Sequence, residues 1–234
     1  MGYRDLLKEA TQLKKQKRYN EASQMLKDAY QEAREDEYVD IHERLRLPTY
    51  LCFADKDEEA WTELERLAGK YTDPISQIAI RSKMQKFLED DDRLNDSLVY
   101  LAWVYVLDLK YRIDQIIEMH QAADHSALEE PLKVEMDDGK VVTLDFNKMN
   151  QNQQPLAFTE LGNPIYDVAH NHLLKSLNDR LNPERIEYGF EELCIKLNRQ
   201  DLPPIITDKI LEILGGQDDI GAWVDDLYDF LKTN

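Results

Sequence analysis

The chain has 234 residues, of which 29 are Lys or Arg and 47 are Asp or Glu, so its formal net charge is −18. With 42% hydrophobic residues it can form a packed core, which excludes a disordered chain, and its negative charge argues against nucleic acid as the main ligand. No apolar run approaches the roughly 18 residues of a membrane span, and no signal peptide precedes the first charges, so we expect a cytoplasmic protein without a membrane partner.

Charge is distributed unevenly along the sequence. Residues 1–34 contain 8 basic and 5 acidic residues, whereas residues 201–234 contain 2 basic and 8 acidic residues. Two solvated helix faces explain this pattern; the alternative is that one face attracts a partner of opposite sign, because rim charges set association rate and specificity. The chain has only 8 Gly and 8 Pro, a composition that favours helices.

The first 33 residues predict two antiparallel helices joined by a polar turn at 14–18, because apolar residues recur at helical spacing on either side of it. These residues are Leu6, Leu7, Ala10 and Leu13, then Tyr19, Ala22, Met25, Leu26, Ala29 and Ala33. A third helix is expected over 37–47, ending near Pro48 or resuming beyond it over 49–54. A fourth is expected over 57–70 and a fifth over 75–88, after the cap-like segment Thr72-Asp73-Pro74.

A family resemblance accompanies these helices. The segment 17–22, followed by Leu26 and Ala29, resembles the middle of a tetratricopeptide repeat, and the first helix supplies matching positions at Leu6, Ala10 and Leu13. The segment 56–60 resembles the same signal 38 residues later, against about 34 in the family. The second unit departs from the pattern at Pro48 and lacks the aromatic at the turn, and a third unit cannot be registered. The resemblance covers about residues 3–90 and implies a stack of helical hairpins; a different helical bundle is the alternative.

The remaining sequence predicts a long helix over 94–119, a β-hairpin over 132–146 with its turn at Asp138-Gly139, a polar linker over 148–154, and further helices over 164–181, 183–197, 204–214 and 219–231. We therefore expect a mainly α protein in three parts. Residues 1–128 form a helical-repeat-like domain, residues 129–155 form the hairpin and linker, and residues 156–234 form a C-terminal helical subdomain packed on the first.

Few residues offer chemistry. His120 with Asp124, and Asp167 with His170, have the spacing of two metal ligands on one helix face, but no third ligand can be identified. Cys52 and Cys194 lie in apolar segments, which is typical of buried, unreactive thiols. The sequence contains no phosphate-binding Gly-rich loop, nucleophile elbow or EF-hand loop. We expect no cofactor, no metal and no catalytic residue.

Three functions remain as hypotheses. The leading one is a non-catalytic adaptor whose helical hairpins bind a protein or peptide. The second is an acidic immunity protein or antitoxin of bacterial type that neutralises a basic toxin, because a strongly acidic binder complements a basic cleft. The third is a metal-dependent hydrolase that uses one of the His/Asp pairs. The sequence names neither the partner nor the oligomeric state.

Candidate partner-binding residues follow from these hypotheses. In the leading one, a groove lined by the first helix of each hairpin exposes Tyr3, Lys14, His42, Arg44, Arg46 and Tyr50. Arg44 and Arg46 would offer planar forks to the carboxylate of an acidic or C-terminal peptide. Alternatively, the acidic tail helix binds a basic partner through Asp225, Asp226 and Asp229, while its apolar stripe packs on the rest of the protein or docks on the partner.

Overall fold

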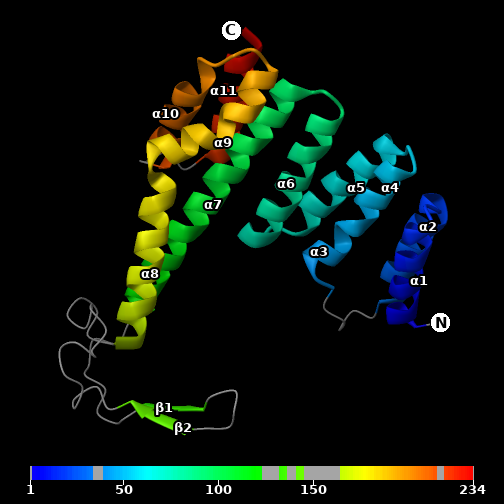
Figure 1. Cartoon of the computed structure of the whole chain (residues 1–234), viewed down its shortest axis with the longest axis horizontal. Helices are drawn as coiled ribbons and strands as arrows, with labels where there is room; N and C mark the ends of the chain where they lie inside the picture. The colour runs from blue at the N-terminus through cyan, green and yellow to red at the C-terminus, as the bar shows by residue number, and fades with distance from the viewer. Residues whose placement is uncertain are drawn as a thin grey trace. The chain divides into compact units, whose positions relative to one another are not determined.

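The computed structural model describes residues 2–33, 39–122, 132–135, 141–144, 164–214 and 219–233. Within these ranges the fold is mainly helical, which confirms the predicted class (Figure 1). The helices are α1 (Tyr3–Lys15), α2 (Tyr19–Glu32), α3 (Ile41–Arg44), α4 (Arg46–Phe53), α5 (Asp57–Lys70), α6 (Pro74–Asp90), α7 (Leu94–Ala122), α8 (Pro164–Leu181), α9 (Pro183–Lys196), α10 (Leu202–Leu214) and α11 (Ile220–Thr233). Within the same ranges, no helix has both the length and the apolar character needed to span a membrane.

The chain packs as two compact units. The first contains Met1–Asp108 and Gly189–Asn234, and therefore α1 to α6, the first half of α7, most of α9, and α10 and α11. The second contains Leu109–Tyr188, with the second half of α7, the two strands and α8. The predicted domain boundaries at 128–129 and 155–156 lie outside the described residues, so the three-part division stays a prediction.

Pro48 does not end a helix, so the expected end of the third helix there is wrong. α3 ends at Arg44, Leu45 interrupts the helix, and α4 begins at Arg46 with Pro48 in its first turn. Proline is tolerated at that position because the first N–H groups of a helix have no intrahelical acceptor. The expected start of the third helix at residue 37 lies outside the described residues.

The start of α6 confirms the predicted cap. The carboxylate of Asp73 accepts a hydrogen bond from the backbone N–H of Ser76 at 2.9 Å, and Pro74 occupies the first helical position. Hydrogen bonding from Ser76 lowers the pKa of Asp73, because it stabilises the ionised form. The local sequence therefore sets the beginning of this helix.

The same turn recurs at the ends of α1, α4, α6 and α9. In each turn one residue has a left-handed backbone, namely Lys17 (φ 60°), Asp55 (φ 56°), Asp92 (φ 58°) and Asn198 (φ 55°). The N–H of the following residue donates to a carbonyl five residues earlier, at 2.8–3.0 Å, as in a Schellman-type helix end. The first three turns are 38 and 37 residues apart along the chain. A structural period therefore runs through α1 to α7.

A small, fully buried residue lies five positions after each of the first three left-handed residues: Ala22, Ala60 and Ser97. In the third case the Ser97 hydroxyl donates to the carbonyl of Gln85 (3.2 Å) and accepts from the Gln85 side-chain amide (2.9 Å). Small side chains allow close helix packing, and these hydrogen bonds satisfy the buried hydroxyl of Ser97. Ser97, hydrogen-bonded to Gln85, thus occupies the position that is alanine in the first two hairpins.

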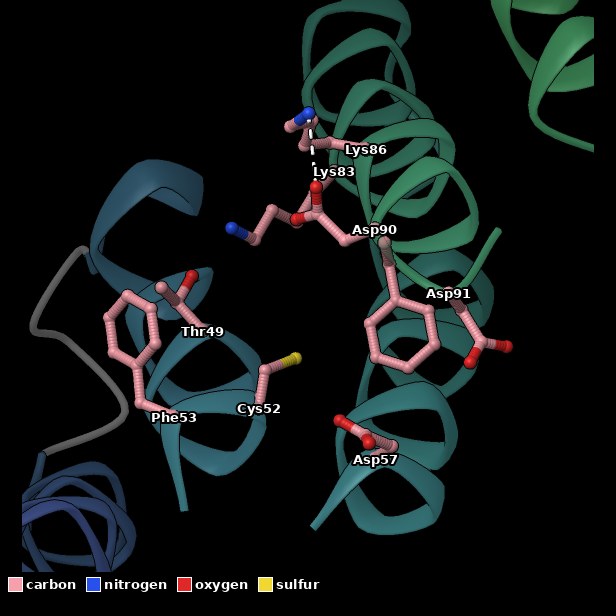
Figure 2. Close-up of a pocket in the computed structure, with 9 residues that line it drawn as sticks. Thr49, Cys52, Phe53, Asp57, Lys83, Lys86, Asp90 and Asp91 are labelled. Carbon is pink, nitrogen blue, oxygen red and sulfur yellow. Dashed lines mark ion pairs between the residues drawn. The ribbon is translucent and has the colours of Figure 1, made fainter. Parts of the chain in front are cut away.

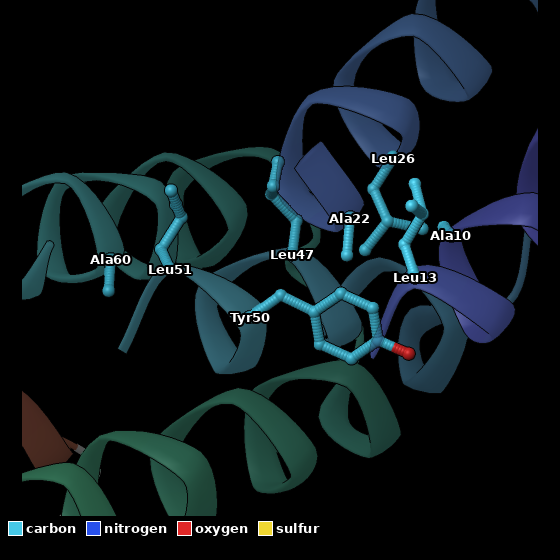
Figure 3. Close-up of a cluster of buried hydrophobic side chains, with 8 residues drawn as sticks. All are labelled: Ala10, Leu13, Ala22, Leu26, Leu47, Tyr50, Leu51 and Ala60. Carbon is cyan, nitrogen blue, oxygen red and sulfur yellow. The ribbon is translucent and has the colours of Figure 1, made fainter. Parts of the chain in front are cut away.

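Neighbouring helices of this series bury apolar residues in two clusters. α1 packs on α2, α2 on α4, α4 on α5, and α5 on α6. Figure 3 shows the cluster that joins the first two hairpins, formed by Ala10, Leu13, Ala22, Leu26, Leu47, Tyr50, Leu51 and Ala60. A second cluster joins α3, α5 and α6 through Ile41, Leu45, Leu64, Leu67, Ile80 and Met84. Burial of these apolar stripes stabilises the packing of each hairpin on the next.

The two strands, β1 (Leu132–Glu135) and β2 (Val141–Leu144), pair antiparallel. Leu132 lies opposite Leu144, and Glu135 opposite Val141. The Asp138-Gly139 turn and the linker over 148–154 lie outside the described residues, so the hairpin turn stays a prediction.

Candidate binding site

A pocket of about 430 Å³ lies between the end of α4, the start of α5 and α6. Its apolar lining comes from Cys52, Phe53 and Phe87. Its polar lining comes from Thr49, Asp57, Lys83, Lys86, Asp90 and Asp91 (Figure 2). The volume and the mixture of apolar and charged groups lie within the range of ligand-binding pockets.

Phe53 forms an aromatic edge of this pocket. It is the last residue of α4, and 47% of its surface is exposed. The Tyr19 ring lies 5.2 Å from the Phe53 ring, and the Lys14 ammonium lies 5.8 Å above the same ring. The pocket edge therefore continues toward the turn between α1 and α2, with a cation already placed on an aromatic face.

Phe87 belongs to a chain of half-buried aromatic rings. Its ring centroid lies 5.6 Å from that of Trp61, which in turn lies 6.1 Å from Tyr100. Tyr100 lies 5.6 Å from Trp103, and the Arg81 guanidinium lies 4.0 Å from the centroid of the Trp103 ring. Tilted and edge-on rings at these distances attract one another, so the contact with Trp61 stabilises the position of the Phe87 ring.

The charged groups of the pocket differ in their partners. Lys86 forms ion pairs with Asp90 (3.0 Å) and Glu89 (3.2 Å), and these hydrogen bonds raise the pKa of Lys86. Within the described part of the chain, Lys83, Asp57 and Asp91 form no ion pair. Figure 2 shows Lys83 and Lys86 toward one end of the pocket, and Asp57 and Asp91 toward the other. The pocket therefore has a basic end and an acidic end.

The Cys52 thiol lies among these charges without being activated by them. Burial raises the pKa of Cys52 to about 11, and Asp57 acts in the same direction, while Lys83 opposes it. At neutral pH this thiol is protonated and is a weak nucleophile. Burial also raises the pKa of Cys194 to about 11. Both thiols are free.

Arg46 is a structural link between α1 and α4. Its guanidinium donates to the Thr11 hydroxyl (2.8 Å) and the Tyr50 hydroxyl (3.2 Å), and it forms an ion pair with Glu43. The fork that the sequence assigned to a ligand carboxylate is thus used inside the protein.

Three further groove residues occupy different surroundings. Tyr50 is buried, so its expected exposure is wrong: its ring fills the core between α1 and α4. Arg44 is half-buried, with its guanidinium 4.6 Å from the centroid of the Tyr30 ring. Tyr3 is half-buried. Because Tyr50 is buried and the Arg46 guanidinium is bonded to other residues of the protein, a groove surface cannot include the whole predicted set.

Lys14 and His42 are exposed, as a contact residue must be. Of the two, Lys14 lies beside Phe53 at the pocket edge. The exposed His42 stands in the first turn of α3, where its backbone N–H donates to the capping carboxylate of Asp40 at 2.7 Å. Lys14 thus contacts a ring that lines the pocket, and neither Arg44 nor Arg46 lines it.

The apolar stripe of α11 packs within the protein. Trp223, Val224, Leu227 and Leu231 are buried, and the Trp223 indole N–H donates to the carbonyl of Lys209 in α10 at 3.1 Å. Asp225, Asp226 and Asp229 are exposed. An acidic surface therefore remains on α11, while its apolar stripe is already covered.

No group of three or more His, Cys, Asp or Glu side chains in the described part of the chain could hold a metal ion. The side chains of His120, Asp124, Asp167 and His170 lie outside that part, so the two predicted pairs stay untested.

Sequence reasoning missed Lys83, Phe87 and Asp91 as pocket residues. The available signal was the spacing of Lys83, Phe87 and Asp91 at i, i+4 and i+8, which places them on one face of α6. Nothing in the sequence showed that this face lies opposite Cys52 and Phe53. Comparison with known proteins adds no further residue, because no family model, curated protein or solved structure matches this chain.

Proposed function

We propose that the protein is a non-catalytic binding protein whose stacked helical hairpins, similar to those of tetratricopeptide-repeat proteins, hold a peptide segment of a partner protein. The recurring left-handed turn and the small residue five positions after it support this reading of α1 to α7 as three related hairpins.

The observation that carries the proposal is the position of the pocket. It opens between α4 and α6, the first helices of the second and third hairpins, and one of its lining rings, Phe53, contacts Lys14 at the end of the first helix of the first hairpin. In the family that the sequence resembles, the outward residues of the first helices face the concave, ligand-binding side. Phe53 and Phe87 supply aromatic surface, which is enriched in protein interfaces.

Filling the pocket tests the proposal. Thr49 lines the pocket and its hydroxyl donates to the carbonyl of Leu45 at 2.7 Å; Thr62 makes the equivalent bond to Glu58 at 2.9 Å but lies in the open depression beside Arg66. Thr49→Trp places an indole ring in the pocket, and Thr62→Trp is the matched control. Peptides selected from a random displayed library against the purified wild-type protein serve as ligands.

We expect Thr49→Trp to raise the Kd of the selected peptides about tenfold or more, since it removes the anchor pocket, while Thr62→Trp leaves it within about twofold. Fluorescence polarisation measures the Kd, and circular dichroism melting checks that both variants fold. Equal binding by both variants, or a library that yields no binder, contradicts the proposal.

A second candidate is an acidic protein that neutralises a basic partner, and the exposed carboxylates of α11 favour it. Such a complex would lose affinity with salt, and also with Asp225→Asn, Asp226→Asn and Asp229→Asn together, but not with Thr49→Trp. A basic nuclease is a suitable test partner. Insensitivity of binding to the triple change, measured by calorimetry, would count against this candidate.

A further inference from the structure

We propose that the pocket between α4 and α6 receives a basic side chain, Lys or Arg, of the partner peptide. The cation lies toward Asp57 and Asp91, and its methylene stem packs on Phe87 and Cys52. This inference rests on the proposed function and names the chemistry of the ligand.

Charge within the pocket favours a cation. Asp90 is paired with Lys86, which leaves Lys83 against two carboxylates, Asp57 and Asp91, in the described part of the chain. Asp91 is also the C-cap of α6, where the negative end of the helix dipole adds to its own charge. The ammonium of Lys83 lies toward the opposite end of the pocket from these carboxylates (Figure 2). A cation between Asp57 and Asp91 would be attracted by both carboxylates and would lie away from the Lys83 ammonium.

The lining fits the shape of a long basic side chain. Lys and Arg bury an aliphatic stem along apolar surface while the head stays polar, which matches Phe87 and Cys52 beside carboxylates. Aromatic faces attract cations, and the protein already makes this contact at the edge of the pocket, where the Lys14 ammonium lies 5.8 Å above the Phe53 ring. A formal charge of −18 raises the rate at which basic partners arrive.

The alternative ligand is an acidic side chain that would pair with Lys83. Substitution of this lysine distinguishes the two ligands, because it changes their affinities in opposite directions. Lys83→Met keeps the length of the side chain and removes the charge, so it strengthens the binding of a basic ligand and weakens that of an acidic one.

The experiment uses two fluorescein-labelled heptapeptides of sequence Gly-Ser-Leu-Xaa-Leu-Ser-Gly, with Xaa either Arg or Glu, and the full chain. We expect the wild-type protein to bind the Arg peptide at least about tenfold more tightly than the Glu peptide, and Lys83→Met to tighten the Arg peptide about two- to fivefold. Asp57→Asn with Asp91→Asn should weaken the Arg peptide about tenfold.

Asp225→Asn with Asp226→Asn is the matched control, because it removes the same charge from exposed residues of α11 that do not line the pocket. This control should change the Kd of the Arg peptide less than about twofold. Equal weakening by both double variants would assign the binding to bulk charge and overturn the inference. Preference for the Glu peptide, weakening by Lys83→Met, or no measurable binding of the Arg peptide would also overturn it.

Thr49→Trp separates this inference from the proposed function. If the Glu peptide binds better and Thr49→Trp abolishes its binding, the pocket is a peptide site with the opposite charge preference, and only the inference fails. If Thr49→Trp leaves the Kd of both peptides unchanged, the pocket is not the site, and both proposals fail.

Discussion

The backbone of Gly189 in α9 lies directly against the phenol ring of Tyr105 in α7. A β-carbon built on Gly189 would lie 2.7 Å from Cζ of Tyr105 and nearer still to its hydroxyl oxygen, which is closer than non-bonded atoms approach. The Tyr105 ring also packs on Phe190, with ring centroids 5.0 Å apart. The absence of a side chain at residue 189 therefore permits this helix contact.

We predict that Gly189→Ala lowers the free energy of unfolding by about 1–3 kcal/mol, because the new methyl group overpacks the contact with Tyr105. Gly69→Ala is the matched control: Gly69 lies in α5 with no atom near the position of its β-carbon, so alanine should stabilise by up to about 1 kcal/mol through helix propensity. Urea denaturation measures both. If Gly189→Ala stabilised the protein, the Tyr105 ring would be able to move away from residue 189 without loss of stability.

Replacing each small residue of the three hairpins tests their equivalence. Ala22→Leu, Ala60→Leu and Ser97→Leu should each lower the free energy of unfolding by about 1–3 kcal/mol, because all three positions are fully buried between helices. Ala222→Leu, on the exposed face of α11, should change it by less than about 0.5 kcal/mol. Thermal denaturation followed by circular dichroism is the measurement. Tolerance at Ala22 and Ala60 would mean that the repeat alignment is wrong.

Arg46→Lys should destabilise the protein although it keeps the charge. A lysine cannot reproduce the separate hydrogen bonds to Thr11 and Tyr50, so we expect a loss of about 1–2 kcal/mol in chemical denaturation. Arg18→Lys, in an exposed ion pair with Glu21, should leave the free energy of unfolding unchanged. Equal effects of the two changes would show that the network around Arg46 contributes nothing specific.

Alkylation of Cys52 should be slow at neutral pH. Because burial raises its pKa to about 11, only about a thousandth of this thiol is ionised at pH 8, and the rate should rise roughly tenfold per pH unit up to that pKa. Iodoacetamide labelling followed by mass spectrometry of the folded protein measures the rate. Rapid labelling of Cys52 at pH 7 would reveal an activated thiol and would reopen a catalytic role.

The sequence alone determined the local parts of this protein. Apolar spacing predicted α1, α2 and α5, and the segment Thr72-Asp73-Pro74 predicted the start of α6, because periodicity and capping depend on neighbours within a few residues. It could not register the third hairpin, because Ser97 is suited to its buried position only through its hydrogen bonds to Gln85. That pairing joins two helices, and sequence periodicity describes one helix at a time.

Tertiary structure decided the candidate site. The sequence offered Arg46 and Tyr50 as exposed groups, but in the packed hairpins Tyr50 is buried and the half-buried Arg46 is hydrogen-bonded to Thr11. The same packing left Cys52 and Phe53 at the edge of α4, opposite Lys83 and Phe87 of α6. Helical spacing fixes which residues share a face, whereas the neighbour that covers this face depends on how the helices pack. Exposure and pocket lining therefore followed from contacts between residues more than 25 positions apart, which no local pattern encodes.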